Sequence, residues 1–252
     1  MTPLTLAAAQ SISIAGDLPG NIARHQAFIR IAAEQGVQLL VFPELSLTGY
    51  EPALAAELAL LPQSPLLQPL RDLARELGVT AVVGMPIRLS AEGPLLIGAL
   101  VLAADGSLAV YSKQHLHAGE EQVFSRGTGG ANLTFAEDQV ALAVCADFSQ
   151  ASHARAAAQS GAGIYAAGVL ISEKGYAADT ALLQGYAVEH AMLVLMANHG
   201  GPTGGWVSAG RSAIWGPDGG LIVTAAGTGD ELLIARRTAG RWSGQQLRVE
   251  AP

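Results

Sequence analysis

The sequence predicts an α/β fold in which helices lie outside two sheets that face each other. Half of the 252 residues are hydrophobic and only 14% are charged, a balance that suits strands covered on both faces. Short apolar strands alternate with amphipathic helical stretches along most of the chain. No linker or composition shift divides the sequence, so residues 1–252 are expected to form a single domain.

The first half of the chain begins with a strand and a helix. Residues 4–10 alternate small and apolar side chains, as a strand does, and Asn21 is placed to cap an amphipathic helix that ends at Gly36. An apolar strand at 38–42 then leads into Glu44. The elements expected next are a helix at 65–77, a strand at 80–85, and a hairpin of strands at 97–104 and 108–113 joined by Asp105-Gly106.

A polar, glycine-rich stretch at 114–138 separates the two halves and is too long for a simple connection, which predicts a functional loop. A buried strand at 140–144 follows and delivers Cys145 directly before a helical segment at 153–159. The remaining expected elements are a strand at 164–167, a helix at 178–191, and strands at 193–197, 211–215, 221–226 and 232–235.

Charge and hydropathy exclude several classes of partner. The net charge is −7 and no long basic run occurs, so the footprint of a nucleic-acid binder is missing. No apolar run approaches the ~20 residues that span a bilayer, and no basic region precedes the apolar N-terminus as in a signal peptide. We therefore expect a cytoplasmic protein that binds neither nucleic acid nor membrane.

The chain has one cysteine, Cys145, which excludes an internal disulfide and a multi-cysteine zinc site. It ends a buried strand and precedes a turn into a helix, where backbone N–H groups and the helix terminus favour a thiolate. The alternative is a buried thiol that packs as a small hydrophobe. The cysteine alone therefore leaves the choice between a structural and a reactive thiol open.

Two charged residues also follow expected strands. Glu44 comes after five apolar residues, so loss of water should raise its proton affinity, as a general base requires, although such a residue can also cap a helix. Lys113 ends another strand and is suited to stabilising an oxyanion, although a lysine at a strand end is often simply solvated.

Together these residues resemble the nitrilase superfamily of carbon–nitrogen hydrolases, whose members carry a Glu, a Lys and a Cys in this order at strand ends. The stretches FPELSLTGY, YSKQHLHAGEEQVFSRG and AVCADF are similar to the family's glutamate, lysine and cysteine blocks. A fourth stretch, AGRSAIWGPDGGLI, is similar to the strand–turn–strand block that follows. The resemblance extends from near the start of the chain to near its end.

The resemblance implies a four-layer α-β-β-α sandwich of two mixed sheets flanked by helices. It implies that Cys145 is the nucleophile, Glu44 the proton carrier and Lys113 the charge stabiliser, with a thioester intermediate and no metal or organic cofactor. In the family a second glutamate positions substrate and lysine, and Glu120 fits that position better than Glu121. It also implies homodimers or higher homo-oligomers, in which the sandwiches of two protomers stack.

A small carboxamide, cleaved to a carboxylate and ammonia, is the expected substrate. The expected substrate-binding residues are Tyr50, Ala146, Phe148 and Tyr176, with the Ala146 N–H as an oxyanion donor. Tyr165 and Trp206 are further aromatic candidates, although aromatic side chains more often pack in a core. The chain differs from many family members after the cysteine, where it has Ala146 and then Phe148-Ser149-Gln150 instead of an aromatic residue and an Arg-Phe pair.

Other interpretations remain open from the sequence. The same residues could serve a nitrile or N-carbamoyl substrate, or acyl transfer. A thiol-dependent protein would use Cys145 alone, and a non-catalytic scaffold would keep the fold without the chemistry. Asp147 is interpreted as a structural residue of the cysteine turn, His115 and His117 as hydrogen-bonding loop residues rather than metal ligands, and residues 199–205 as a flexible loop that can line the pocket.

Overall fold

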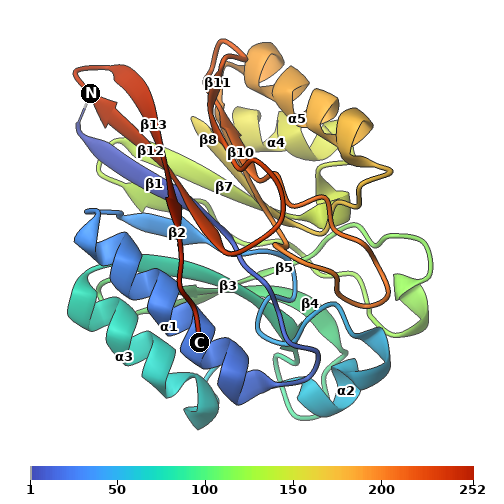
Figure 1. The fold of residues 1–252 in the computed structure, drawn as a ribbon. Helices are drawn as coiled ribbons and strands as arrows, with labels where there is room; N and C mark the ends of the chain where they lie inside the picture. The colour runs from blue at the N-terminus through green and yellow to red at the C-terminus, as the bar shows by residue number, and fades with distance from the viewer. Residues whose placement is uncertain (1) are drawn as a thin grey trace.

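The computed structural model describes residues 2–252. In that part of the chain two mixed sheets stack face to face and helices cover both outer surfaces (Figure 1). One sheet has seven strands in the order β13-β12-β1-β2-β3-β4-β5, and the other has six in the order β11-β10-β9-β8-β7-β6. This is the α-β-β-α sandwich that the sequence predicted.

The seven-stranded sheet and the helices that cover it come mostly from the first half of the chain. Helices α1 and α3 pack against its outer face, where they share a hydrophobic cluster with its strands (Figure 1). The elements are β1 (Leu4–Gln10), α1 (Leu18–Glu34), β2 (Leu39–Val41), α2 (Ala55–Leu58), α3 (Gln68–Leu77), β3 (Thr80–Ile87), β4 (Leu96–Leu102), β5 (Leu108–Ser112), β12 (Glu231–Thr238) and β13 (Arg241–Arg248).

The six-stranded sheet is built from the second half, and helices α4 and α5 cover its outer face. Its elements are β6 (Leu133–Phe135), β7 (Asp138–Val144), α4 (Ala151–Gln159), β8 (Ile164–Val169), α5 (Tyr176–His190), β9 (Leu193–Asn198), β10 (Ala213–Trp215) and β11 (Leu221–Thr224). A third hydrophobic cluster fills the space between the sheets, with Leu6 and Val82 from one and Leu142 and Ala166 from the other. This cluster fixes the two sheets relative to each other.

Two sequence predictions about single elements were wrong. Helix α1 begins at Leu18, and Asp17 caps it by accepting from Gly20 N. Asn21 lies inside the helix instead, where its side chain bonds the backbone of Ile14 and Leu47. The long stretch at 114–138 also contains the short strand β6, so it is not a loop throughout.

Strand β13 was not predicted at all. Most of its residues are exposed, so its sequence RWSGQQLR lacks the alternation of apolar and polar residues by which a half-buried strand is recognised. It pairs along its whole length with β12 at the sheet edge.

Two glycines allow the segment after β2 to run between the sheets. A Cβ atom at Gly84 on β3 would collide with the backbone of Pro43 and Leu45, and one at Gly168 on β8 would collide with the carbonyl of Phe42. Only glycine permits this close backbone approach from both sides. The segment that carries Glu44 is therefore held between the two sheets.

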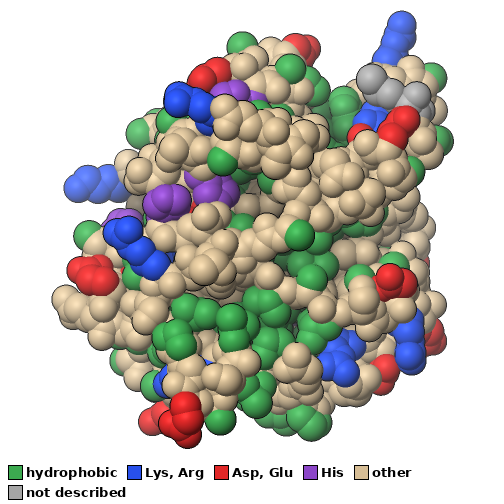
Figure 2. Space-filling model, turned by 180° about the vertical axis from the view of Figure 1, so that it is seen from behind, with side chains coloured by type: hydrophobic (Ala, Val, Ile, Leu, Met, Phe, Trp, Pro, Cys, Tyr) green, Lys and Arg blue, Asp and Glu red, His purple; other side chains and the backbone are tan. Residues whose placement is uncertain are grey.

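The outer surface shows no concentration of one charge on the face seen in Figure 2, where basic side chains lie singly among acidic ones. Among residues 2–252, no helix combines the length and the apolar character needed to cross a membrane.

Candidate active site

Glu44 follows β2 and is buried, with 2% of its surface exposed. Its backbone carbonyl accepts a hydrogen bond from His199 Nε2 at 2.7 Å. Burial lowers the pKa of His199 to about 4, so the ring is neutral near pH 7 and has one N–H to donate. The next residue, Leu45, has φ 51°, a left-handed conformation that costs energy for a branched side chain. The Glu44 backbone is thus held from several directions.

Lys113 follows β5 and its ammonium group is fully buried. Its Nζ lies 2.6 Å from Glu44 Oε1 and 2.8 Å from Glu120 Oε1. Burial acts to lower the pKa of Lys113, but the electrostatic effects of Glu44, Cys145 and Glu120 outweigh it and raise the pKa above its ordinary value. Lys113 therefore carries a positive charge between two carboxylates.

Glu120, rather than Glu121, belongs to this cluster. Glu120 Oε1 also accepts from Tyr50 Oη at 2.8 Å, and its Oε2 accepts from the backbone N–H of His117 at 2.8 Å. Glu121 is exposed and accepts from Gly119 N. Each oxygen of Glu120 is bonded, which fixes the carboxylate that orients Lys113.

Cys145 begins a single helical turn, Cys145–Asp147, directly after β7. Its φ is 43°, so the nucleophile candidate has the strained left-handed backbone that is found at functional turns. Its Sγ donates toward the carbonyl of Leu170 at 3.7 Å. Burial and the negative charge of Glu44 raise the pKa of Cys145 well above its ordinary value, while Lys113 acts in the opposite direction. The resting group is a neutral thiol.

One carboxylate oxygen beside this thiol has no partner. Glu44 Oε1 is bound by Lys113, whereas the buried Glu44 Oε2 makes no hydrogen bond within residues 2–252. Burial raises the pKa of Glu44, against the opposing effect of Lys113, and the Cys145 thiol is among the groups that favour its ionised form. A buried carboxylate oxygen left unpaired next to a thiol can accept the thiol proton.

Asp147 joins the cysteine turn to the segment after Lys113. Its Oδ2 accepts from Val144 N at 3.1 Å, and its Oδ1 accepts from Gln114 N at 3.0 Å and His115 N at 2.8 Å. This confirms the structural interpretation of Asp147. It also explains how two strands from different sheets hold Cys145 and Lys113 in a constant relation.

A cavity of about 250 Å³ contains the thiol and the two glutamates. Tyr50, Ala146 and Phe148, expected at the substrate site, line it together with Trp206. The other lining residues are His117, Ser149, Leu170, Ile171, Ser172, Gly175 and Asp179.

Two expected aromatic residues lie elsewhere. Tyr176 packs under the Arg211 guanidinium and donates to the Arg211 carbonyl at 2.7 Å. Tyr165 is fully buried beneath α4 and α5 and is not a pocket residue. The sequence did not single out His199 or Asp179, because a histidine before a glycine-rich loop and an aspartate in a first helical turn carry no distinctive signal.

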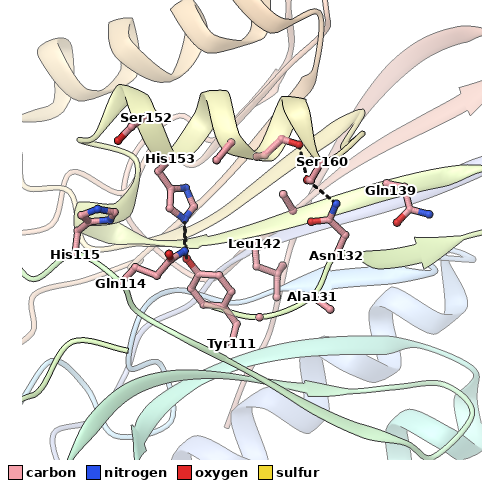
Figure 3. Close-up of a pocket in the computed structure, with 14 residues that line it drawn as sticks. Tyr111, Gln114, His115, Ala131, Asn132, Gln139, Leu142, Ser152, His153 and Ser160 are labelled. Atoms are coloured by element: carbon pink, nitrogen blue, oxygen red, sulfur yellow. Dashed lines mark hydrogen bonds between the residues drawn. The ribbon is translucent and has the colours of Figure 1, made fainter. Parts of the chain in front are cut away.

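A larger hollow of about 630 Å³ does not contain the thiol (Figure 3), and three of its lining residues, Tyr111, Gln114 and His115, bond Asp147. Tyr111, Gln114 and His153 converge in it, with His153 Nε2 2.8 Å from Tyr111 Oη and 2.9 Å from Gln114 Nε2. Tyr111 Oη also donates to Asp147 Oδ2 at 2.7 Å. This network supports the cysteine turn from behind. Within residues 2–252, no group of three His, Cys, Asp or Glu side chains is placed to hold a metal ion.

Comparison with known proteins agrees with this geometry. The family model "Carbon-nitrogen hydrolase" matches residues 5–244. This chain belongs to the carbon–nitrogen hydrolase family. A family member named nitrilase, from Pyrococcus abyssi, is 28% identical over 223 residues, which are 85% of this chain and 82% of that protein. The glutamine-dependent NAD(+) synthetase of Thermotoga maritima is 29% identical over 171 residues, 66% of this chain but 29% of the synthetase.

Solved structures of an amidase from Nesterenkonia sp. AN1, a nitrilase-superfamily protein, are also similar to this carbon–nitrogen hydrolase. One mutant of that amidase carries the acetamide moiety of fluoroacetamide on its active-site cysteine. It is 29% identical, with TM-score 0.83 over 93% of this chain and 90% of that one. Another mutant holds butyramide, again at 29% identity and TM-score 0.83, over 94% and 92% of the two chains. The family and the sandwich fold predicted from the sequence are thereby confirmed.

Proposed function

We propose that the protein hydrolyses a small carboxamide to a carboxylate and ammonia, with Cys145, Glu44 and Lys113 as the catalytic residues and Glu120 as the residue that positions Lys113. The observation that carries the proposal is the Lys113 ammonium, 2.6 Å from Glu44 and 2.8 Å from Glu120, buried beside a cavity that holds a thiol. The amide ligands of the Nesterenkonia amidase support the substrate class.

The first chemical step transfers the Cys145 proton to Glu44 Oε2, the oxygen that lacks a partner. Burial raises the pKa of both groups, the Cys145 thiol stays neutral at rest, and the thiolate forms when the substrate is in place. The thiolate attacks the amide carbonyl, and the oxyanion is stabilised by Lys113 and the N–H of Ala146.

The second stage releases the products. Glu44 gives its proton to the departing ammonia, and an acyl thioester remains on Cys145. Glu44 then takes a proton from a water molecule that attacks the thioester. The C–S bond breaks, the carboxylic acid leaves, and Glu44 returns the proton to the Cys145 thiolate. The proposed steps use only side chains, backbone and water.

A nitrile, or an N-carbamoyl compound, is the second candidate substrate class of the same site. The name of the Pyrococcus abyssi relative favours the nitrile. An N-carbamoyl substrate would follow the same steps as an amide and form a carbamoyl thioester. Thiol chemistry that uses Cys145 alone, or a non-catalytic scaffold, would leave the Glu44–Lys113–Glu120 cluster without a purpose, although such a buried charge cluster costs stability.

The test combines ammonia release with intact-mass detection of an acyl adduct, using acetamide, propionamide, butyramide, butyronitrile and an N-carbamoyl amino acid. We expect ammonia from the amides and an acyl group on wild-type protein, with neither in Cys145→Ala. Turnover of the nitrile or the carbamoyl compound alone would support the second candidate. A folded wild-type protein that gives no ammonia and no adduct would support the scaffold.

We further propose that residues 1–252 form one catalytic domain and that two or more copies assemble through the layer of α4 and α5, in the cytoplasm, where thiols stay reduced. The exposed Val188 on α5, with 59% of its surface accessible, is consistent with such a face. Light scattering would detect the dimer, and Val188→Glu should shift it toward the monomer.

A further inference from the structure

A third carboxylate, Asp179, lines the cavity of Cys145 in addition to Glu44 and Glu120. It lies in the first turn of α5, and its backbone N–H donates to the Gly175 carbonyl at 3.0 Å. Glu120 is bonded through both oxygens, but the Asp179 carboxylate has no hydrogen bond and no ion pair within residues 2–252. Its interaction with His117, another lining residue, is electrostatic.

The space beside Gly175 is occupied by this carboxylate. A Cβ atom at Gly175 would lie 2.9 Å from Asp179 Oδ2, and Gly175 itself lines the cavity. The carboxylate therefore lies against the cavity wall, in a gap that the missing side chain of Gly175 leaves open.

The charge of the cavity lining is one-sided. None of the lining residues described for 2–252 is Lys or Arg. The Lys113 ammonium lies behind the lining, where Glu44 and Glu120 bind it. An anionic group on a substrate would be repelled by Asp179, whereas a cationic group would gain Asp179 as a partner. Among the described lining residues, His117 is the one side chain near Asp179 that can carry a positive charge.

Aromatic side chains complete this wall. Tyr50, Phe148 and the half-exposed Trp206 line the cavity, and His117 packs edge-on against the Trp206 ring at a centroid distance of 6.1 Å. Trp206 and Asp179 line the same cavity, and an aromatic ring and a carboxylate are two groups that recognise an ammonium group. The cavity volume of about 250 Å³ suits a short acyl chain beside the thiol.

We propose that the preferred substrate is a short carboxamide with an ammonium group on its acyl part, held by Asp179 and the Trp206 ring while the amide carbon lies at Cys145. This rests on the proposed amide hydrolysis. In the reaction the amide C–N bond breaks, ammonia leaves, and the ammonium-bearing acyl group passes from Cys145 to water as a carboxylate.

Three amides of nearly equal size test the proposal: 4-aminobutanamide, which is cationic, pentanamide, which is neutral, and succinamate, which is anionic. We expect kcat/KM to be roughly tenfold higher for 4-aminobutanamide than for pentanamide, and lowest for succinamate. Asp179→Asn should remove the advantage of the cation, so that kcat/KM for 4-aminobutanamide falls to about that for pentanamide in the same variant. Glu189→Gln removes a carboxylate from an exposed position of the same helix. It should change neither the preference for the cationic amide nor the turnover of pentanamide.

The outcomes separate this inference from the proposed function. Pentanamide turned over as well as, or better than, 4-aminobutanamide by wild-type protein would overturn the inference and leave amide hydrolysis intact. A cation preference that survives in Asp179→Asn would also overturn it. Failure of all three amides would instead count against the proposed function. Because pentanamide reports folding and catalysis within each variant, a misfolded Asp179→Asn protein would be recognised by its loss of pentanamide turnover.

Discussion

The hollow lined by Tyr111 and His153 and the cavity that contains the Cys145 thiol differ in size and in chemistry. The larger, of about 630 Å³, is lined by polar side chains that bond one another, such as Tyr111 with His153 and Asn132 with Ser160. The smaller, of about 250 Å³, contains buried charges and a carboxylate oxygen without a partner. The reactive site is therefore marked by a buried hydrogen-bonding atom without a partner, and not by the larger cavity volume.

The largest effect is expected at Lys113 in the small cavity. Lys113→Met would leave two buried carboxylates without their cation, so we expect a loss of about 3–5 kcal/mol in the free energy of unfolding and of at least about 10³-fold in kcat. Urea denaturation and ammonia release measure the two losses. Arg75→Met, which breaks an exposed ion pair with Asp72, is the control and should have little effect on either quantity. If Arg75→Met lost as much stability and kcat as Lys113→Met, the buried ion pairs of Lys113 would be no more important than an exposed one.

A smaller effect is expected at Asp147, which bonds both the backbone before Cys145 and Tyr111 of the larger hollow. Asp147→Asn keeps the shape but replaces one acceptor oxygen with an NH2 group, which cannot accept from the donors that both oxygens now serve. We expect a loss of roughly 1–3 kcal/mol in stability and a fall in kcat with KM nearly unchanged, because the cysteine turn shifts relative to Lys113. Unchanged kcat with reduced stability would show that Asp147 supports the fold alone.

The smallest effects are expected in the large hollow. Tyr111→Phe removes one hydrogen bond to Asp147, so we expect a loss of about 1 kcal/mol in stability and a modest fall in kcat. Asn132→Ala, which removes the bond to Ser160 on the same hollow's rim, should leave kcat unchanged. If Asn132→Ala lowered amide turnover as strongly as Tyr111→Phe, the larger hollow would take part in the reaction directly.

The sequence predicted the parts of the molecule that depend on local pattern. The apolar strands before Glu44 and Cys145 and the helix that ends at Gly78 follow from periodicity and from glycine's access to positive φ, which is 69° at Gly78. The family blocks then gave the order of Glu, Lys and Cys. Where the pattern is weak, as in the exposed strand β13, prediction failed.

Features that depend on the packing of distant segments could not be predicted from the sequence. The bond from His199 to the Glu44 carbonyl joins residues 155 positions apart, and nothing in the sequence around His199 indicates it. The same is true of Asp179, whose importance arises from the cavity that other elements form around it. Asn21 was misplaced because its amide bonds Leu47, a distant backbone carbonyl, instead of capping its own helix.

The central claim is that Glu44 Oε2 takes the proton of Cys145, and Glu44→Gln tests it most directly. Glu44 raises the pKa of the Cys145 thiol, so its neutral replacement should lower that pKa and make alkylation by iodoacetamide faster at a given pH. Amide hydrolysis should fall by about 10²–10⁴-fold, because the proton carrier is gone. Faster alkylation together with lost hydrolysis is the predicted result. Hydrolysis that stays within a few-fold of wild type would contradict the account.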